Sequence, residues 1–131
     1  MEENEITGNI IGCAIEVHRE LGPGLLESAY EEALCYELDK SGLSFLRHQD
    51  VPIKYKDIAL ATPLRLDLLV EGKVIVENKS KFEIHPVDKQ KLLTYLRLTG
   101  LRLGLLINFN VTKLVDGVSR VINQLPEDKS E

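Results

Sequence analysis

Two apolar segments, residues 64–70 and 74–79, are joined by a short loop around Gly72 and predict a β-hairpin. Both segments carry apolar residues at neighbouring as well as alternate positions, which is typical of strands covered on both faces in the middle of a sheet. A hairpin of this kind requires helices or further strands around it. If the loop has three residues, the register sets Asp67 opposite Glu77, with Cβ atoms about 5 Å apart.

The charged residues of this hairpin form the candidate site. Side chains alternate along a strand, so Glu77 and Lys79 project from the same face. Two facing carboxylates repel each other unless a cation lies between them, and hard oxygen ligands suit Mg²⁺ or Mn²⁺. A lysine beside such an ion orients a water or stabilises charge that develops on phosphorus. The pattern of Asp67, Glu77 and Lys79 favours metal-assisted phosphodiester hydrolysis, and a structural ion-pair network is the alternative.

Composition limits the class of protein. The chain has 131 residues, 44% hydrophobic and 28% charged, and we expect one globular domain, 1–131, with a frayed end at 124–131. No apolar run approaches the ~20 residues that cross a bilayer, and the acidic first residues lack the apolar segment of a secretory signal. Cys13 and Cys35 have no metal-ligand spacing, so we expect reduced thiols in a cytoplasmic protein.

The net charge of −5 disfavours nucleic-acid binding, but the charge is unevenly distributed. Residues 1–72 contain 14 acidic and 6 basic side chains, a net charge of −8, whereas residues 73–120 contain 4 acidic and 9 basic ones, a net charge of +5. The basic part contains Glu77 and Lys79. This asymmetry is able to orient a polyanion toward those two residues.

Hydrophobic periodicity and chain-breaking residues predict a mixed α/β fold. Two N-terminal helices are separated at Pro23, and a third helix begins at Pro86 and stops before Gly100. The predicted elements are helices at 6–21, 25–40 and 86–99, strands at 51–56, 64–70, 74–79 and 103–109, and an undecided strand or helix at 118–122. We therefore expect the order α-α-β-β-β-α-β, with a mixed β-sheet flanked by helices.

Two predicted helices add candidates to the site. Glu27 is placed to reach a metal ion directly or through a water, or else only to interact with the helix dipole. Tyr30, on the same helical face, is either a substrate contact or a core aromatic. Lys91 and Tyr95 stand one turn apart on the third helix and can both face a phosphate backbone. Gln90 precedes Lys91 and is rotated from it by about 100° around that helix, so it is either a substrate contact or part of the solvated face.

The segment Gly24-Leu25-Leu26-Glu27-Ser28-Ala29-Tyr30 fits the pattern Gly-x-x-Glu-x-x-Tyr, and the chain resembles the GxxExxY protein family. The similarity extends to residues 65–70, 92–96 and 100–109 and covers the chain from about 6 to 122. That family is grouped with the PD-(D/E)XK nuclease superfamily. The resemblance therefore implies a restriction-endonuclease-like core and divalent-metal phosphodiesterase chemistry.

The resemblance also implies roles for individual residues. Asp67 and Glu77 would be metal ligands, and the backbone carbonyl of Asn78 would be a further ligand. Lys79 would assist the attacking water. Glu27 resembles the helical acidic residue of RecB-like exonucleases, which supplements the metal site.

Three positions depart from the family pattern. Leu66 replaces the proline of the superfamily name, and Asn78 is polar where an apolar residue is usual. Tyr95 resembles the tyrosine of the Gln-x-x-x-Tyr helix motif of RecB-like exonucleases, but Lys91 stands at the glutamine position and Gln90 one place earlier. A lysine contacts phosphate as a point charge and lacks the directional bonds of an amide.

These observations predict a nuclease that uses Mg²⁺ or Mn²⁺ and binds nucleic acid, DNA in preference to RNA, with no membrane partner. A catalytically inactive nuclease-fold module that binds nucleic acid or a protein is the alternative. A hydrolase or binder of a small phosphorylated ligand is a third class. The sequence leaves open the strandedness of the substrate, the cut polarity, and whether an edge strand or the 103–109 region pairs two copies in a homodimer.

Overall fold

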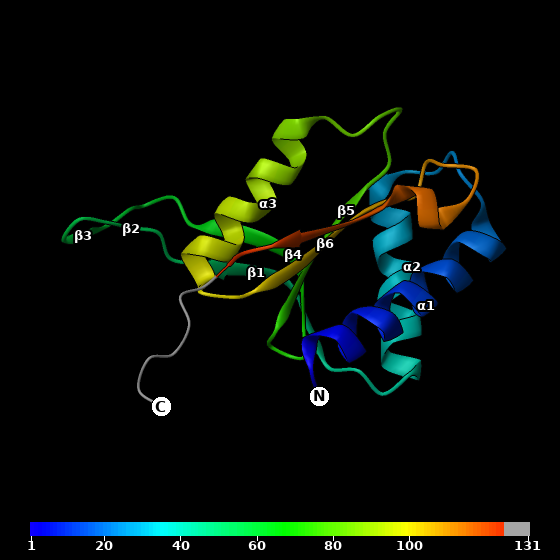
Figure 1. The fold of residues 1–131 in the computed structure, drawn as a ribbon, viewed down its shortest axis with the longest axis horizontal. Coiled ribbons are helices and arrows are strands. Elements are labelled where there is room, and N and C mark those ends of the chain that lie inside the picture. The colour runs from blue at the N-terminus through cyan, green and yellow to red at the C-terminus, as the bar shows by residue number, and fades with distance from the viewer. Residues whose placement is uncertain (125–131) are drawn as a thin grey trace.

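A five-stranded sheet lies between two layers of helices in the computed structural model, which describes residues 1–124 (Figure 1). Helices α1 and α2 cover one face of the sheet and α3 covers the other. The elements in chain order are α1 (Glu3–Leu21), α2 (Glu27–Lys40), β1 (Phe45–Val51), β2 (Lys54–Tyr55), β3 (Ile58–Ala59), β4 (Leu64–Val70), β5 (Val74–Lys79), α3 (Pro86–Thr99), β6 (Leu103–Asn108), the 3-10 turn η1 (Leu114–Gly117) and β7 (Val118–Ile122).

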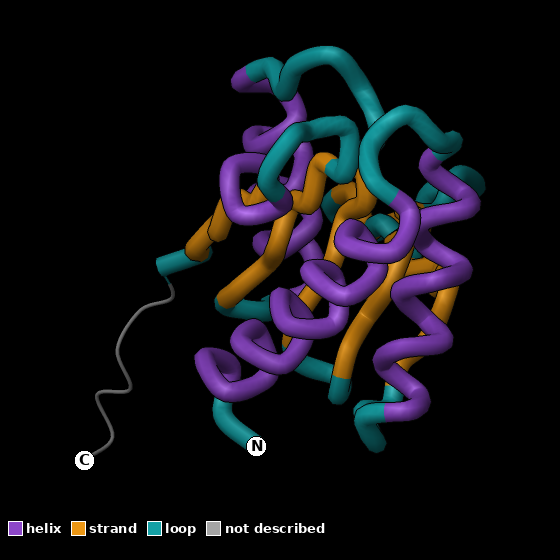
Figure 2. Tube along the Cα trace, turned by 90° about the vertical axis from the view of Figure 1, so that its right-hand side faces the viewer, coloured by secondary structure: helices purple, strands orange, loops and turns teal. Residues whose placement is uncertain are grey.

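The strand order is β1-β4-β5-β6-β7, so β4, β5 and β6 are interior strands. β5 and β6 run parallel and are connected through α3, whereas the other neighbouring pairs of this sheet are antiparallel. The predicted mixed β-sheet flanked by helices is confirmed. Parallel neighbours bring the ends of β5 and β6 to the same edge, where Lys79 pairs with Asn108. Figure 2 shows the long loops gathered at one end of the sheet.

The predicted hairpin is confirmed, with its three-residue loop. The ladder between β4 and β5 begins at Val70 opposite Val74, and Gly72 in the loop has a φ of 66°, a conformation that glycine adopts at little cost. Continuing this register places Asp67 opposite Glu77, one position beyond the last paired residues. The strands therefore end their pairing where the two carboxylates meet.

The first strand is the main correction to the predicted elements. The sequence suggests a strand at 51–56, but β1 occupies 45–51 and pairs with β4. Its middle, 47–50, is polar because β1 is an edge strand and much of it faces solvent, so it lacks a detectable apolar pattern. Residues 54–59 instead contain β2 and β3, a small hairpin that projects from the body (Figure 1). Residues 118–122 form β7, the other edge strand.

Each face of the sheet has its own apolar core. The larger core lies under α1 and α2, and a smaller one lies under α3 around Leu92 and Leu96. Helix α3 approaches β6 so closely that a Cβ on Gly104 would lie 2.9 Å from the Leu92 side chain. The three predicted helices are confirmed, and this packing holds the face of α3 that carries Lys91 and Tyr95 near the sheet.

Two further predictions concern the end of the chain and membranes. The predicted frayed end, 124–131, lies outside the described residues apart from Gln124. Within residues 1–124, no helix combines the length and the apolar character needed to cross a bilayer.

Candidate active site

The site begins at an irregularity in β4. Alternate residues of a strand normally face the same side, yet Leu66 packs in the core under α3 and Leu68 packs in the core under α1 and α2. The strand therefore turns over at Asp67, between them. The opposite residue in β1 is His48, whose φ of 51° is a left-handed conformation that is uncommon for residues with a side chain. This turn interrupts the ladder and lets the Asp67 carboxylate face β5.

Asp67 and Glu77 form a pair of carboxylates across the hairpin. The backbone N–H of Asn78 donates to Asp67 Oδ2 at 3.0 Å and fixes that side chain beside β5. Glu77 is only 6% exposed, and its Oε1 atom has no hydrogen-bond partner among the described residues. Burial, together with the charge and close contact of Asp67, raises the pKa of Glu77 to about 9, and Lys79 opposes this shift. Without a cation, the pair therefore retains a proton.

The donor set of this pair fits a hard divalent cation. Two carboxylates, one with a buried oxygen that lacks a partner, supply the ligand type that Mg²⁺ and Mn²⁺ prefer. A cation between them would replace the proton and compensate the buried charge. Among residues 1–124, no three His, Cys, Asp or Glu side chains are grouped closely enough to hold one ion. The protein thus offers two carboxylate ligands here, and Mg²⁺ sites commonly complete their coordination with water and phosphate oxygens.

Lys79 and Glu27 lie within electrostatic range of the pair. Lys79 ends β5, two residues after Glu77, and therefore projects from the same face. Glu27 is the first residue of α2; partial burial raises the pKa of its carboxyl, the charge of Lys79 lowers it, and Asp67 raises it further. The structure brings Asp67, Glu77, Lys79 and Glu27 together, although Glu27 does not join the pair as a third ligand to one ion in this arrangement.

A cleft of about 390 Å³ lies beside the pair and adds residues that sequence reasoning misses. Glu27 and Asp67 line it together with Glu31, Arg47 and His48. Glu31 Oε2 accepts from the Arg47 guanidinium at 3.0 Å and lies 2.7 Å from His48 Nε2. Arg47 and His48 escape sequence reasoning because they belong to the polar edge strand. The spacing of Glu31, one helical turn after Glu27, is the signal that points to this cluster.

Helix α3 contributes Lys91 and Tyr95 to the surroundings of the pair. Lys91 Nζ lies 5.6 Å from the centre of the Tyr95 ring. Interaction with the Tyr95 hydroxyl raises the pKa of Lys91, burial lowers it, and the charges of Glu77 and Asp67 raise it further. Lys91 is therefore within electrostatic range of both carboxylates. Gln90 is exposed and lies about 100° round the helix from Lys91.

Tyr30 does not face the cleft. It is fully buried and stacks on Phe109, with ring centres 4.6 Å apart. Its hydroxyl donates to the Gly22 carbonyl at 2.5 Å and accepts from the Leu25 N–H at 3.1 Å. The prediction of a substrate contact at Tyr30 is corrected to a structural role, because a residue without exposed surface does not touch a substrate. Tyr30 instead fixes the turn from which Glu27 projects.

Asn78 is buried on the face of β5 opposite to Glu77. Its Nδ2 and Oδ1 atoms both lack a hydrogen-bond partner among the described residues. The side chain therefore takes no part in the carboxylate pair, and only the backbone of Asn78 is available to it. The backbone N–H already donates to the Asp67 carboxylate. The backbone carbonyl is therefore the atom of Asn78 that a metal ligand role would require.

Comparison with known families assigns the chain to a superfamily. The model of the PD-(D/E)XK nuclease superfamily matches residues 4–121, a range that contains all the candidate residues. No curated protein and no solved structure matches the chain at a significant level. The five-stranded mixed sheet with helices on both faces is consistent with a restriction-endonuclease-like fold. Because the family model covers nearly the whole chain, this protein belongs to the PD-(D/E)XK nuclease superfamily.

Proposed function

We propose that this protein is a nuclease that hydrolyses phosphodiester bonds of nucleic acid with a bound Mg²⁺ or Mn²⁺. The observation that carries the proposal is the carboxylate pair: a buried Glu77 with an unpartnered oxygen faces Asp67, and Lys79 follows on the same strand. A purely structural ion-pair network would instead supply Glu77 with a cation from the chain in direct contact. Membership in a nuclease superfamily supports the proposed chemistry, although fold alone does not establish activity.

The proposed roles follow from the chemistry of each group. Asp67 and Glu77 hold the cation, and the backbone carbonyl of Asn78 is a further ligand. When bound, the cation polarises a phosphate oxygen and acidifies a water. Lys79 orients the attacking water or stabilises the charge that develops on phosphorus. Glu27 acts through a water, which fits its position in the wall of the cleft.

The proposed substrate is nucleic acid, with DNA preferred to RNA. Lys91 supplies a point charge for a phosphate beside Tyr95, and Gln90 adds a polar contact on the neighbouring face of α3. The net charge of +5 on residues 73–120 attracts a polyanion to this part of the chain. We also propose that the chain is of the GxxExxY type, with Glu27 equivalent to the acidic helical residue of RecB-like exonucleases.

A cleavage assay tests this proposal. The parent protein is incubated with single- and double-stranded DNA and RNA in Mg²⁺, in Mn²⁺ or in EDTA. We expect cleavage only with a divalent cation, and a loss of at least about 100-fold in Asp67→Asn and Lys79→Ala, because each variant removes a group that acts on the transition state. Lys40→Ala is the matched control, since Lys40 is an exposed lysine at the other end of α2 from Glu27.

Two outcomes would contradict the proposal. Cleavage that is equal in the parent, Asp67→Asn and Lys79→Ala would show that a contaminating nuclease is responsible. Binding of nucleic acid without cleavage in any of the cations would favour the inactive module.

The groove between α1 and α2 favours a second candidate function, a module that binds a protein partner. The groove has a volume of about 460 Å³ and is lined by apolar side chains such as Leu21 and Tyr36. Its charged lining residues are all acidic: Glu16, Glu20, Glu32 and Glu37. Such a groove fits an apolar segment with basic flanks. If this is the function, Glu32→Lys weakens partner binding and leaves any nuclease activity unchanged.

A further inference from the structure

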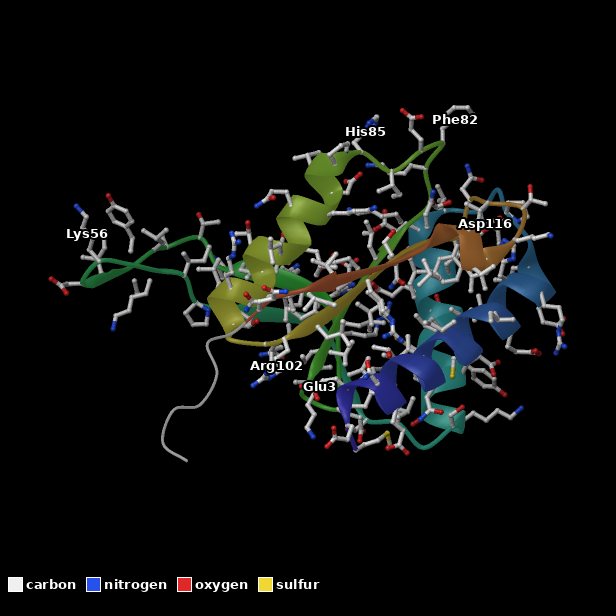
Figure 3. All side chains as sticks on the ribbon, in the orientation of Figure 1. Glu3, Lys56, Phe82, His85, Arg102 and Asp116 are labelled. Carbon is white, nitrogen blue, oxygen red and sulfur yellow. The ribbon has the colours of Figure 1, made fainter. Side chains whose placement is uncertain are left out.

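Phe82 is the most exposed large apolar residue among residues 1–124, with 93% of its surface in solvent. It lies in the loop between β5 and α3, three residues after Lys79. Figure 3 shows its ring projecting away from the fold. Exposure of an aromatic ring to water is unfavourable, and the π-face of such a ring is suited to stacking. The ring is therefore available to a flat group from outside the chain.

The loop that presents this ring is anchored at the residues before it. The Lys81 N–H donates to Asn108 Oδ1 at 3.1 Å, and Asn108 Nδ2 donates back to the Lys81 carbonyl at 3.0 Å. The Lys81 ammonium lies 2.9 Å from Asp88 in the first turn of α3. The Ser80 hydroxyl donates to the Leu25 carbonyl at 2.5 Å. Because these contacts already hold Ser80 and Lys81 in place, a ligand that stacks on the Phe82 ring has to order little additional chain.

Cationic groups and a cavity surround the ring. The cavity has a volume of about 450 Å³, within the range of small-ligand sites, and is lined by Phe82, Ile84, His85, Lys89, Asn108 and Asp116 among others. Lys79 and Lys81 lead into the loop from the carboxylate pair. The neighbouring carboxylate of Glu83 lies 3.8 Å from His85 Nδ1. When His85 is protonated, it offsets part of the negative charge of Glu83. The setting combines one flat apolar surface with the ammonium groups of Lys79 and Lys89, whereas Lys81 is paired with Asp88 and Asp116 adds a carboxylate to the cavity.

We propose that Phe82 stacks on an unpaired nucleobase next to the scissile phosphate, so that the substrate class is single-stranded nucleic acid or a single-stranded end. Lys79 and Lys89 face the phosphates of that strand, and the cavity receives the adjoining nucleotide. Every base presents a π-face, so this contact selects unpaired strands without selecting a sequence. In a closed duplex the bases are already stacked and the ring has no partner.

A nucleobase suits this position better than a protein surface does. The chain neighbours of Phe82, Lys81 and Glu83, are both charged, and charged residues are depleted from the core of protein interfaces. The ring also stands in the basic part of the chain, a few residues after the carboxylate of Glu77 and the ammonium of Lys79. An exposed ring with lysine side chains nearby is an arrangement that sites for single-stranded nucleic acid use.

The absence of tryptophan from the sequence makes a direct test available. Phe82→Trp introduces one indole, and we add Asp67→Asn and EDTA so that no cleavage interferes. A short oligodeoxyuridylate or oligouridylate should quench the indole fluorescence, whereas a blunt duplex should bind with at least about tenfold lower affinity. Tyr36→Trp, exposed in the acidic groove between α1 and α2, is the matched control and should not respond. The ratio of the two oligonucleotide affinities identifies the preferred sugar.

A second set of variants measures the ring without a fluorophore. Phe82→Ala should weaken binding of the single strand by about 5- to 150-fold, the loss that one stacked base accounts for, and Phe82→Tyr should retain it. No quenching, equal quenching by the duplex, or unchanged single-strand affinity in Phe82→Ala would overturn the proposal. So would a change from dimer to monomer in Phe82→Ala by sedimentation, because a second copy of the chain would then cover the ring.

This inference rests on the proposed nuclease function for its substrate, but the two fail separately. If single strands quench the fluorescence but the protein cleaves no nucleic acid, the stacking role of Phe82 stands and the proposed nuclease activity is rejected. Metal-dependent cleavage that prefers duplex and is unchanged in Phe82→Ala would retain the nuclease and reject the stacking role.

Discussion

Glu31 and Glu77 are almost equally buried, 5% and 6% exposed, but the side chains around them differ. Glu31 meets two nitrogen-bearing side chains, the guanidinium of Arg47 at 3.0 Å and the imidazole of His48 at 2.7 Å. Glu77 meets a second carboxylate, and one of its oxygens has no partner among the described residues. Both glutamates lie near the same turn in β4, so the contrast is local.

The difference separates a structural carboxylate from one that needs a ligand. Burial of a charge is costly unless an opposite charge and hydrogen bonds compensate it. The fold supplies that compensation for Glu31 through Arg47 and His48. For Glu77 we propose that it comes from outside, as a proton when no metal is present and as a divalent cation when one is bound. Four measurements test this difference between Glu31 and Glu77.

The first expected effect is stabilisation by metal. A cation that binds only the folded state at 100 times its dissociation constant adds about 2.7 kcal/mol to the free energy of unfolding. We expect this gain for the parent and for Glu31→Gln, and none for Glu77→Gln. Urea unfolding in EDTA and in excess Mn²⁺ measures it. An equal gain in the parent and Glu77→Gln would mean that the ion binds elsewhere.

The second effect concerns stability without metal. Glu31→Gln should lower the free energy of unfolding by about 1–2 kcal/mol, near the lower end for charged hydrogen bonds because Arg47 and His48 are partly solvated. Glu77→Gln should cost nothing or stabilise, because the amide is neutral beside Asp67 without having to take up a proton. Urea unfolding in EDTA compares the two variants. Equal losses of unfolding free energy in Glu31→Gln and Glu77→Gln would contradict the difference between the two glutamates.

The third effect is the pH dependence of stability in EDTA. The pKa of Glu77 rises from 4.5 to about 9 on folding, so the folded state binds more protons than the unfolded state between these values. The free energy of unfolding therefore falls as pH increases through this window, and it levels off above it. Relative to the parent, Glu77→Gln should gain stability as pH rises from about 5 to about 9. A constant difference between them would contradict the raised pKa.

The smallest effect is expected at Asn78, whose side chain is also buried without a partner but is not part of the pair. Asn78→Val removes two unsatisfied polar atoms and introduces a residue that suits a buried strand, so we expect a gain of about 0.5–1 kcal/mol at most. The stabilisation by Mn²⁺ should persist, because the backbone is unchanged. Loss of that stabilisation would assign a metal role to the Asn78 side chain.

Part of the candidate site follows from the sequence because its determinants are local. The three-residue loop around Gly72 and the period of two along a strand are enough to set Asp67 opposite Glu77 and to place Lys79 on the same face as Glu77. Helix α3 is equally local, since Pro86 and Gly100 mark its ends. None of these inferences needs the position of another element.

Other parts depend on contacts between distant segments. β1 has a polar middle and becomes a strand because β4 offers it an edge to pair with. Tyr30 has the spacing of a residue that faces the cleft, but Phe109 and the turn at Gly22 draw it into the core. The cluster of Glu31 with Arg47 and His48 joins α2 to β1, and local spacing marks only Glu31 in it.

By itself, the sequence determined which groups face each other across one hairpin, because alternation and loop length depend only on neighbouring residues. Only the tertiary structure decided that Glu31 contacts a guanidinium and an imidazole and that Glu77 contacts neither kind of group among the described residues. The physical reason is that compensation of a buried charge depends on which distant side chains the packing brings within a few ångströms. The turn of β4 at Asp67, opposite the left-handed His48, is the place where this packing leaves one carboxylate without a partner.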